Sequence, residues 1–163
     1  MKTLFVIRHA KSSWNIGTLN DFDRPLNDRG HTDAPIMAKR LLEKQKCIDC
    51  IISSPANRAL TTAKYFAKEF KINSNSIQQI PSLYHASVDV FYAVISEIKN
   101  EFNSAVIFSH NPGITHFVNE LTNIKIDNMP TCGIFAVKIN SNHWEDFSTT
   151  EKEFFLFDYP KKL

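Results

Sequence analysis

Glycine and cysteine are both scarce in this chain of 163 residues, and each scarcity excludes a class of function. Its four glycines are too scattered to form a phosphate-binding P-loop or a dinucleotide-binding fingerprint. The three cysteines, Cys47, Cys50 and Cys132, are an odd number and provide no disulfide framework. Cys47 and Cys50 have C-x-x-C spacing, but zinc ribbons and fingers need a second ligand pair, which the chain does not have. We therefore expect buried thiols and no metal or redox site.

Long apolar runs and an excess of one charge are also missing. No apolar run approaches the ~20 residues of a membrane-spanning helix, and the first strand is too short for the core of a signal peptide. The 19 basic and 17 acidic residues give a net charge of +2, which is too balanced to indicate a nucleic-acid partner. The metalloprotease, EF-hand and serine-hydrolase motifs are absent as well. We expect a cytoplasmic protein with no membrane or nucleic-acid partner.

The composition is that of an ordinary globular protein, with 43% hydrophobic and 22% charged residues. A chain of this length buries about 70% of its unfolded surface, which is enough for one core. There are no repeats, low-complexity tracts or linkers. We expect residues 1–163 to form a single domain.

Short apolar segments alternate with amphipathic ones along the chain. Strands are expected at 4–7, 48–53, 77–80, 105–108, 134–139 and 154–157, and helices at about 27–42, 55–70, 88–102 and 114–121. Asn27 is a suitable N-cap for the first helix, and Pro35 should either kink that helix or begin a second one capped by Asp33. This alternation predicts an α/β three-layer sandwich, a mainly parallel central sheet with helices on both faces, in which the last two strands can form an antiparallel edge.

Polar residues follow three of the expected strands. Arg8 and His9 end the first, Arg58 lies in the first turn of the helix after the second, and His110 ends the 105–108 strand. Such a residue alone is usually a surface or core residue, but the carboxyl ends of parallel strands converge on one sheet edge. Arginine binds phosphate oxygens bidentately, and a neutral imidazole is a competent nucleophile. The pattern predicts phosphoryl transfer without a metal or cofactor, in which one histidine attacks and the other three residues stabilise charge.

Three segments resemble the histidine phosphatase superfamily, the fold of phosphoglycerate mutases and acid phosphatases. They are Arg8-His9-Ala10-Lys11-Ser12-Ser13-Trp14-Asn15, Ser54-Pro55-Ala56-Asn57-Arg58-Ala59 with Thr62-Ala63, and Ser109-His110-Asn111-Pro112-Gly113. The compact length and Asp23-Arg24-Pro25-Leu26 are most similar to the SixA-type phosphohistidine phosphatases. The resemblance implies that His9 becomes phosphorylated and that Arg8, Arg58 and His110 complete the phosphate pocket. It further implies phosphate contacts from Asn15 and Arg24.

The sequence departs from the wider family at two places. Ala10 stands where glycine is usual, which requires a backbone that accepts a Cβ atom. Many relatives also carry a glutamate general acid after the second helix, whereas Ser82-Leu83-Tyr84-His85 offers no carboxylate. The remaining candidates for protonating the leaving group are Asp21, Asp23 and His85.

The missing glutamate bears on the substrate. Phosphohistidine expels an imidazole, which leaves readily, so a dedicated acid matters less for it than for an alkyl phosphate. The short chain also shows no lid segment, and an open cleft suits a phosphorylated protein such as a phosphotransfer domain. We expect a phosphohistidine phosphatase acting on a protein. The alternatives are a phosphatase of small-molecule or aryl phosphomonoesters and a non-catalytic phosphate-binding regulatory module, although an inert module has no need of the nucleophile.

Overall fold

The computed structural model describes residues 1–14, 17 and 20–162. The strands within these residues are β1 (Lys2–Arg8), β2 (Cys50–Ser53), β3 (Gln78–Gln79), β4 (Ser104–Ser109), β5 (Ile134–Ile139) and β6 (Lys152–Asp158). The α-helices are α1 (Asp28–Lys44), α2 (Asn57–Glu69), α3 (Val88–Ser96) and α4 (Gly113–Leu121). Short 3₁₀ turns occur at Asp21–Asp23, Ser74–Ser76, Pro81–Leu83 and Trp144–Asp146.

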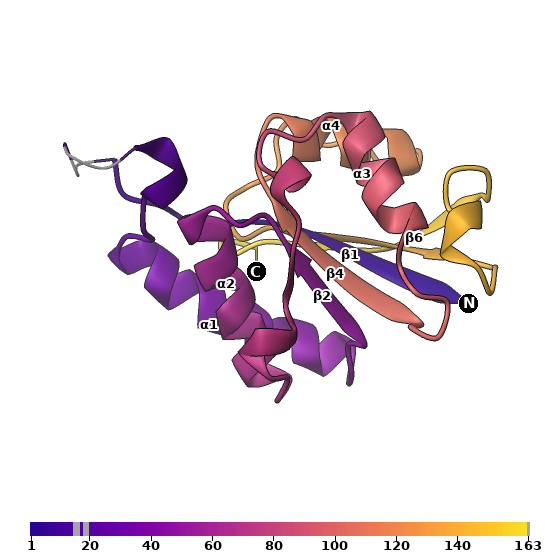
Figure 1. Ribbon diagram of the computed structural model, residues 1–163, viewed down its shortest axis with the longest axis horizontal. Helices are drawn as coiled ribbons and strands as arrows, with labels where there is room; N and C mark the ends of the chain where they lie inside the picture. Colours follow the sequence, from indigo (N-terminus) through magenta and orange to yellow (C-terminus); the bar gives the residue numbers. More distant parts are fainter. Residues whose placement is uncertain (15–16, 18–19, 163) are drawn as a thin grey trace.

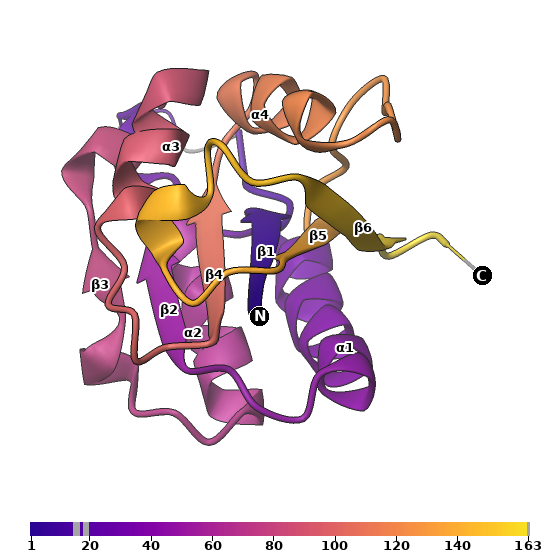
Figure 2. The same ribbon diagram turned by 90° about the vertical axis from the view of Figure 1, so that its right-hand side faces the viewer.

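All six strands form one sheet in the order β3-β2-β4-β1-β5-β6. The β3, β2, β4 and β1 strands are parallel, and β5 and β6 add an antiparallel edge beside β1. Figure 2 shows β2, β4 and β1 pointing the same way. Helices α1 and α2 cover one face of the sheet and α3 and α4 the other (Figure 1). The expected three-layer α/β sandwich with a mainly parallel sheet is confirmed.

The central strands are buried on both faces, and alternate residues of each strand belong to two separate cores. In β1, Leu4 and Val6 pack into the core under α3 and α4, whereas Phe5 and Ile7 pack into the core with α1 and α2. The period of two follows from the pleat, which sends successive side chains to opposite faces. Both cores hold the carboxyl end of β1 in place, where the candidate site begins.

The helices of the structure decide one open alternative and correct one boundary. Helix α1 begins after its Asn27 cap and includes Pro35, so the single-helix alternative holds and no second helix starts at Asp33. Helix α3 ends at Ser96 rather than at residue 102. The chain then turns, and the buried Lys2 ammonium donates to the carbonyl oxygens of Asn100 and Phe102.

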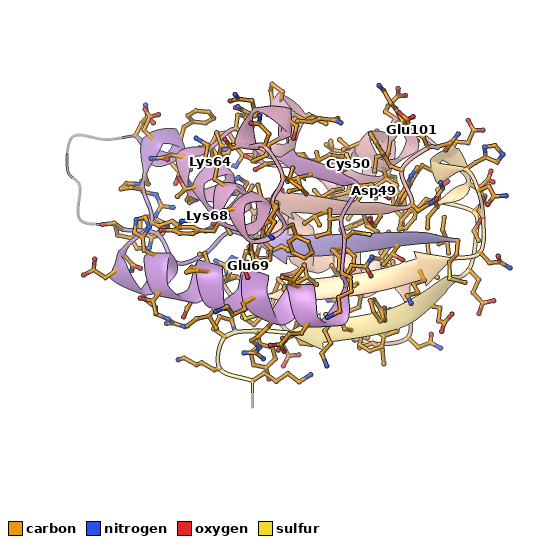
Figure 3. The ribbon with its side chains drawn as sticks, turned by 90° about the horizontal axis from the view of Figure 1, so that it is seen from below. Asp49, Cys50, Lys64, Lys68, Glu69 and Glu101 are labelled. Atoms are coloured by element: carbon orange, nitrogen blue, oxygen red, sulfur yellow. The ribbon has the colours of Figure 1, made fainter. Side chains whose placement is uncertain are left out.

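The three cysteines differ in how far they are buried. Cys50 and Cys132 are buried, but Cys47 is exposed, which corrects the expectation of three buried thiols. Cys50 begins β2, beside Asp49, at the end of the strand remote from Ser53 (Figure 3). Among the residues that the structure describes, no group of three metal-ligating side chains occurs. None of the helices in the described ranges is long and apolar enough to cross a membrane.

Candidate active site

The carboxyl ends of β1, β2 and β4 meet at one edge of the sheet. Register pairs Arg8 with Ser109 and Ser53 with Phe108, so the residues that follow each strand become neighbours. The rings of His9 and His110 have centroids 5.1 Å apart. A cleft of about 290 Å³ opens here, and its lining includes Arg8, His9, Arg24, Arg58, His85 and His110. Three larger surface hollows elsewhere hold no comparable cluster of arginine and histidine side chains among their described lining residues. A neighbouring hollow shares His85 and His110 with the cleft, but no arginine is among its described lining residues.

His9 is buried, and its Nδ1 atom is 2.8 Å from the carbonyl oxygen of Ala10. A carbonyl oxygen can only accept, so Nδ1 carries the proton and Nε2 keeps its lone pair. Burial lowers the pKa of His9 well below the ordinary 6.5, and the nearby His110, Arg58 and Arg8 lower it further against the opposing effect of the Ala10 bond. His9 is therefore a neutral imidazole with a free Nε2, the form that can act as a nucleophile.

The backbone after His9 is held from two sides. The Ala10 N–H donates to Thr62 Oγ1 (3.0 Å), whose hydroxyl donates to the carbonyl oxygen of Arg58 (2.7 Å). Ala10 is fully buried and is not among the described residues with positive φ, so its Cβ is accommodated without backbone strain. On the other side, the start of α1 approaches so closely that a Cβ at Gly30 would lie 2.1 Å from the Lys11 carbonyl oxygen. Only glycine permits this approach.

Asp21 connects two arginines of the site. Its Oδ2 accepts from Arg58 Nη2 (3.0 Å) and from the Tyr84 hydroxyl (2.5 Å), and its Oδ1 accepts from Arg24 Nε (3.1 Å). The Tyr84 hydrogen bond and the charge of Arg58 lower the pKa of Asp21 to about 2. The carboxylate is ionised at neutral pH. This argues against Asp21 as the proton donor and indicates that it holds the guanidinium groups in place.

Three nitrogens in the cleft region have no partner in the protein. Among the described residues, the only buried side-chain nitrogen or oxygen atoms without a hydrogen bond are Arg8 Nε, Arg58 Nε and His110 Nδ1. Burial and the charge of Arg58 also lower the pKa of His110 to about 3, so this imidazole is neutral at pH 7. Leaving a buried donor unpaired is costly, and native structures rarely do so. An anion with several acceptor oxygens fits this set.

The other predicted site residues divide into three groups. Arg24 lies in the cleft, where its guanidinium stacks on the Trp14 ring at 3.6 Å and donates to Ser12 Oγ. His85 also lines the cleft, and its ring lies against that of Tyr84 at a tilt of 36°, with centroids 3.9 Å apart. Asp23 is exposed and does not line the cleft. Asn15 lies outside the described residues.

Sequence reasoning gave no role to three contributors to the site. Tyr84, which bonds to Asp21, lies in the segment where many relatives carry glutamate. Ser54 directly follows β2, and its Oγ is 2.8 Å from His110 Nε2. Both lie in segments that the sequence had already singled out. The third is the carbonyl oxygen of Met129, which accepts from Arg8 Nη1 at 2.9 Å. A backbone contact from a distant loop leaves no signal in the sequence.

Comparison with known proteins agrees with this geometry. The profile of the Histidine phosphatase superfamily (branch 1) matches residues 4–85. A chloroplastic protein of Arabidopsis thaliana is 29% identical over 153 residues, covering 89% of this chain and 70% of that protein. The solved structure of the protein histidine phosphatase SixA complexed with tungstate superposes with a TM-score of 0.80 at 25% identity, covering 97% of each chain. A mycobacterial glucosyl-3-phosphoglycerate phosphatase superposes with a TM-score of 0.69 at 14% identity, covering 96% of this chain and 98% of that chain.

The fold, with paired histidines and arginines at the strand ends, is that of the phosphoglycerate mutase-like class. This chain belongs to the histidine phosphatase superfamily, branch 1. Among solved structures it resembles the SixA phosphohistidine phosphatases over nearly its whole length. Membership of the family supports phosphatase activity.

Proposed function

We propose that this protein hydrolyses phosphohistidine in a protein through a covalent intermediate on His9. The observation that carries the proposal is the set of three unpartnered nitrogens, Arg8 Nε, Arg58 Nε and His110 Nδ1, beside a neutral His9 with a free Nε2. Phosphoryl oxygens satisfy the three nitrogens as donors, and the phosphorus atom then lies within the cleft that His9 lines.

The reaction runs in two steps. In the first, the Nε2 lone pair of His9 attacks phosphorus, a new N–P bond forms, and the bond from phosphorus to the leaving group breaks. Arg8, Arg58 and neutral His110 stabilise the charge on the equatorial oxygens. In the second step, water attacks the phosphorus of phospho-His9 and the N–P bond breaks. The released inorganic phosphate carries the oxygen and both protons of the water, and the His9 Nε2 atom recovers its lone pair.

His85 is the best placed of the three candidates for protonating a leaving group. Asp21 is ionised and bonded to two arginines, and Asp23 does not line the cleft, whereas His85 does. If His85 is the donor, His85→Ala should slow the hydrolysis of an alkyl phosphate about 100-fold and that of a phosphoramidate much less. Equal effects on the two substrates would exclude this role.

The substrate class rests on two supports. The imidazole of phosphohistidine is a good leaving group, which suits a site that lacks the glutamate of many relatives. The SixA structure that resembles this chain is that of a protein histidine phosphatase, and the superposition covers 97% of both chains. A small-molecule phosphatase is the competing assignment within the same fold.

The covalent mechanism is tested by rapid mixing with an aryl phosphate. Wild-type protein should give a burst of phenol and an acid-labile phosphoenzyme, and His9→Ala should give neither, with turnover reduced at least about 1,000-fold. Full activity in His9→Ala would overturn the mechanism. Phosphate binding without turnover in the wild-type protein would identify a binding module instead.

The substrate is tested separately by comparing kcat/KM for a phosphohistidine-containing phosphotransfer domain with that for simple sugar phosphates. The phosphorylated domain should be preferred by at least about tenfold, because an imidazole leaves more readily than an alkoxide. Faster hydrolysis of the sugar phosphates would contradict the protein-substrate assignment and leave the covalent mechanism untouched.

A further inference from the structure

We propose that Ser54 is a positioning residue that holds His110 in the tautomer with its proton on Nδ1, so that His110 offers a hydrogen-bond donor to the phosphoryl group. The proposal concerns the same pocket and rests on the proposed function for its catalytic meaning. Its structural part, which links a serine hydroxyl to a histidine tautomer, does not depend on turnover.

Ser54 is rigidly held directly after β2. Its side chain is fully buried, and its N–H donates to the Phe108 carbonyl oxygen (3.0 Å). In this position the Ser54 hydroxyl lies 2.8 Å from His110 Nε2. A hydroxyl rotates freely only when its surroundings allow it, and here two neighbours determine its direction.

A proton count assigns that direction. The Ser54 hydroxyl has one proton and two lone pairs. The Ala56 N–H donates into one lone pair at 3.2 Å, and among the described residues the remaining contact of the oxygen is His110 Nε2. If Nε2 carried a proton, Oγ would accept twice and its own proton would be buried without an acceptor. The hydroxyl therefore donates to Nε2, and the proton of the neutral ring is on Nδ1.

This assignment also accounts for the other side of the ring. His110 Nδ1 is buried and unpartnered, as are Arg8 Nε and Arg58 Nε. With a proton on Nδ1, all three nitrogens are donors and match an anion with several oxygens. With the opposite tautomer, Nδ1 would present a lone pair that repels those oxygens.

The two histidines thus share a tautomer but perform opposite tasks. His9 is held through its protonated Nδ1 by the Ala10 carbonyl oxygen, which leaves the Nε2 lone pair free. His110 is held through its unprotonated Nε2 by Ser54, which leaves the Nδ1 proton free. The chemical type of the holding group, acceptor in one case and donor in the other, decides which ring becomes nucleophile and which becomes donor.

The test reads the tautomer by ¹⁵N NMR of the histidine rings in the full-length protein. In the wild-type protein, His110 should show a protonated Nδ1 and an unprotonated Nε2, and Ser54→Ala should convert it to a mixture or to the Nε2-protonated form. Ser53→Ala is the matched control, because Ser53 is equally buried and adjacent but its hydroxyl bonds to a carbonyl oxygen. That variant should leave the tautomer unchanged, and Ser54→Thr, which keeps a hydroxyl, should restore it.

Binding of inorganic phosphate supplies the second readout. Ser54→Ala should weaken it about tenfold, the value of one lost hydrogen bond, and Ser53→Ala should not. A protonated Nε2 in the wild-type protein, or an unchanged tautomer in Ser54→Ala, would overturn the proposal even in an active enzyme. If Ser54→Ala does not fold, the tautomer of His110 in the wild-type protein still tests the proposal. If the tautomer is as expected and the protein binds inorganic phosphate but hydrolyses neither phosphohistidine nor aryl phosphate, the Ser54 assignment is supported and the proposed function is refuted.

Discussion

His9 and His110 owe their charge state to burial. Both imidazoles are about 6% exposed and lie near Arg8 and Arg58, so the cationic form of each is disfavoured. In the folded protein both rings stay neutral far below the pH at which an ordinary histidine takes up a proton. The His9 nucleophile is therefore in its reactive, neutral form, but the same lowered pKa values make the folded protein less stable at acidic pH.

We expect stability to fall as the pH drops below 6.5, the ordinary pKa of histidine. The unfolded chain then binds protons at these two residues and the folded chain does not, so stability rises with pH across this window. Each residue contributes a slope approaching about 1.4 kcal/mol per pH unit. Urea unfolding at about pH 7.5, 6 and 5 should show the sum of the two contributions, about 2.8 kcal/mol per pH unit at most, and His110→Gln should reduce it by roughly half. An identical slope in the two proteins would contradict the lowered pKa of His110.

At the scale of elements, the start of α1 supports the loop that carries the nucleophile. Asn27 caps the helix by accepting from the Gly30 N–H (2.9 Å), and the Asn27 N–H donates to the Lys11 carbonyl oxygen (3.0 Å). The first turn of the helix is therefore bonded to the segment that follows His9. A shift of this turn would move the reacting atoms.

Gly30→Ala should separate the helix from that segment, because the added Cβ would lie 2.1 Å from the Lys11 carbonyl oxygen. Overpacking of this kind costs about 1–3 kcal/mol, measured by urea unfolding, and kcat should fall with it. Gly17→Ala is the matched control, since a Cβ there meets nothing within 4 Å. It should change stability by less than about 0.5 kcal/mol. Similar losses in both variants would show that the contact has no special role.

At the scale of the whole molecule, the order β2-β4-β1 brings residues from three distant segments to one edge. Lys2 anchors the opposite end of β1. Its buried ammonium donates to the carbonyl oxygens of Asn100 and Phe102 and to Asn103 Oδ1. The Lys2 side chain thus connects β1 to the segment that precedes β4 through three hydrogen bonds.

Lys2→Met should destabilise the molecule by about 1–3 kcal/mol, because it leaves these acceptors without a donor. Activity at low temperature should stay unchanged, since Lys2 and Arg8 lie at opposite ends of β1. Thermal unfolding and aryl phosphate hydrolysis measure the two effects. Lys99→Met removes an exposed lysine nearby and should leave both properties as they are. A loss of kcat without a loss of stability in Lys2→Met would contradict the assignment of Lys2 to stability alone.

The sequence alone determined the class of fold, and it predicted that Arg8, His9, Arg58 and His110 would meet at one edge of the sheet, where they line one cleft. Apolar periodicity is a local property, so it located the strands and helices within a few residues, and the polar residues after three strands were visible without a structure. The prediction failed where apolar periodicity continues beyond the end of a helix. Helix α3 ends at Ser96, before the segment whose carbonyl oxygens Lys2 binds.

Only the tertiary structure decided the protonation and the partners of the site. Burial of His9 and His110, the ionised state of Asp21 and the Tyr84 hydrogen bond all arise between segments far apart in the chain. The pKa of a group depends on solvent exclusion and neighbouring charge, which residue spacing does not encode. The same is true of the tautomers of the two histidines. They depend on a carbonyl group and a hydroxyl group that the fold places against each ring.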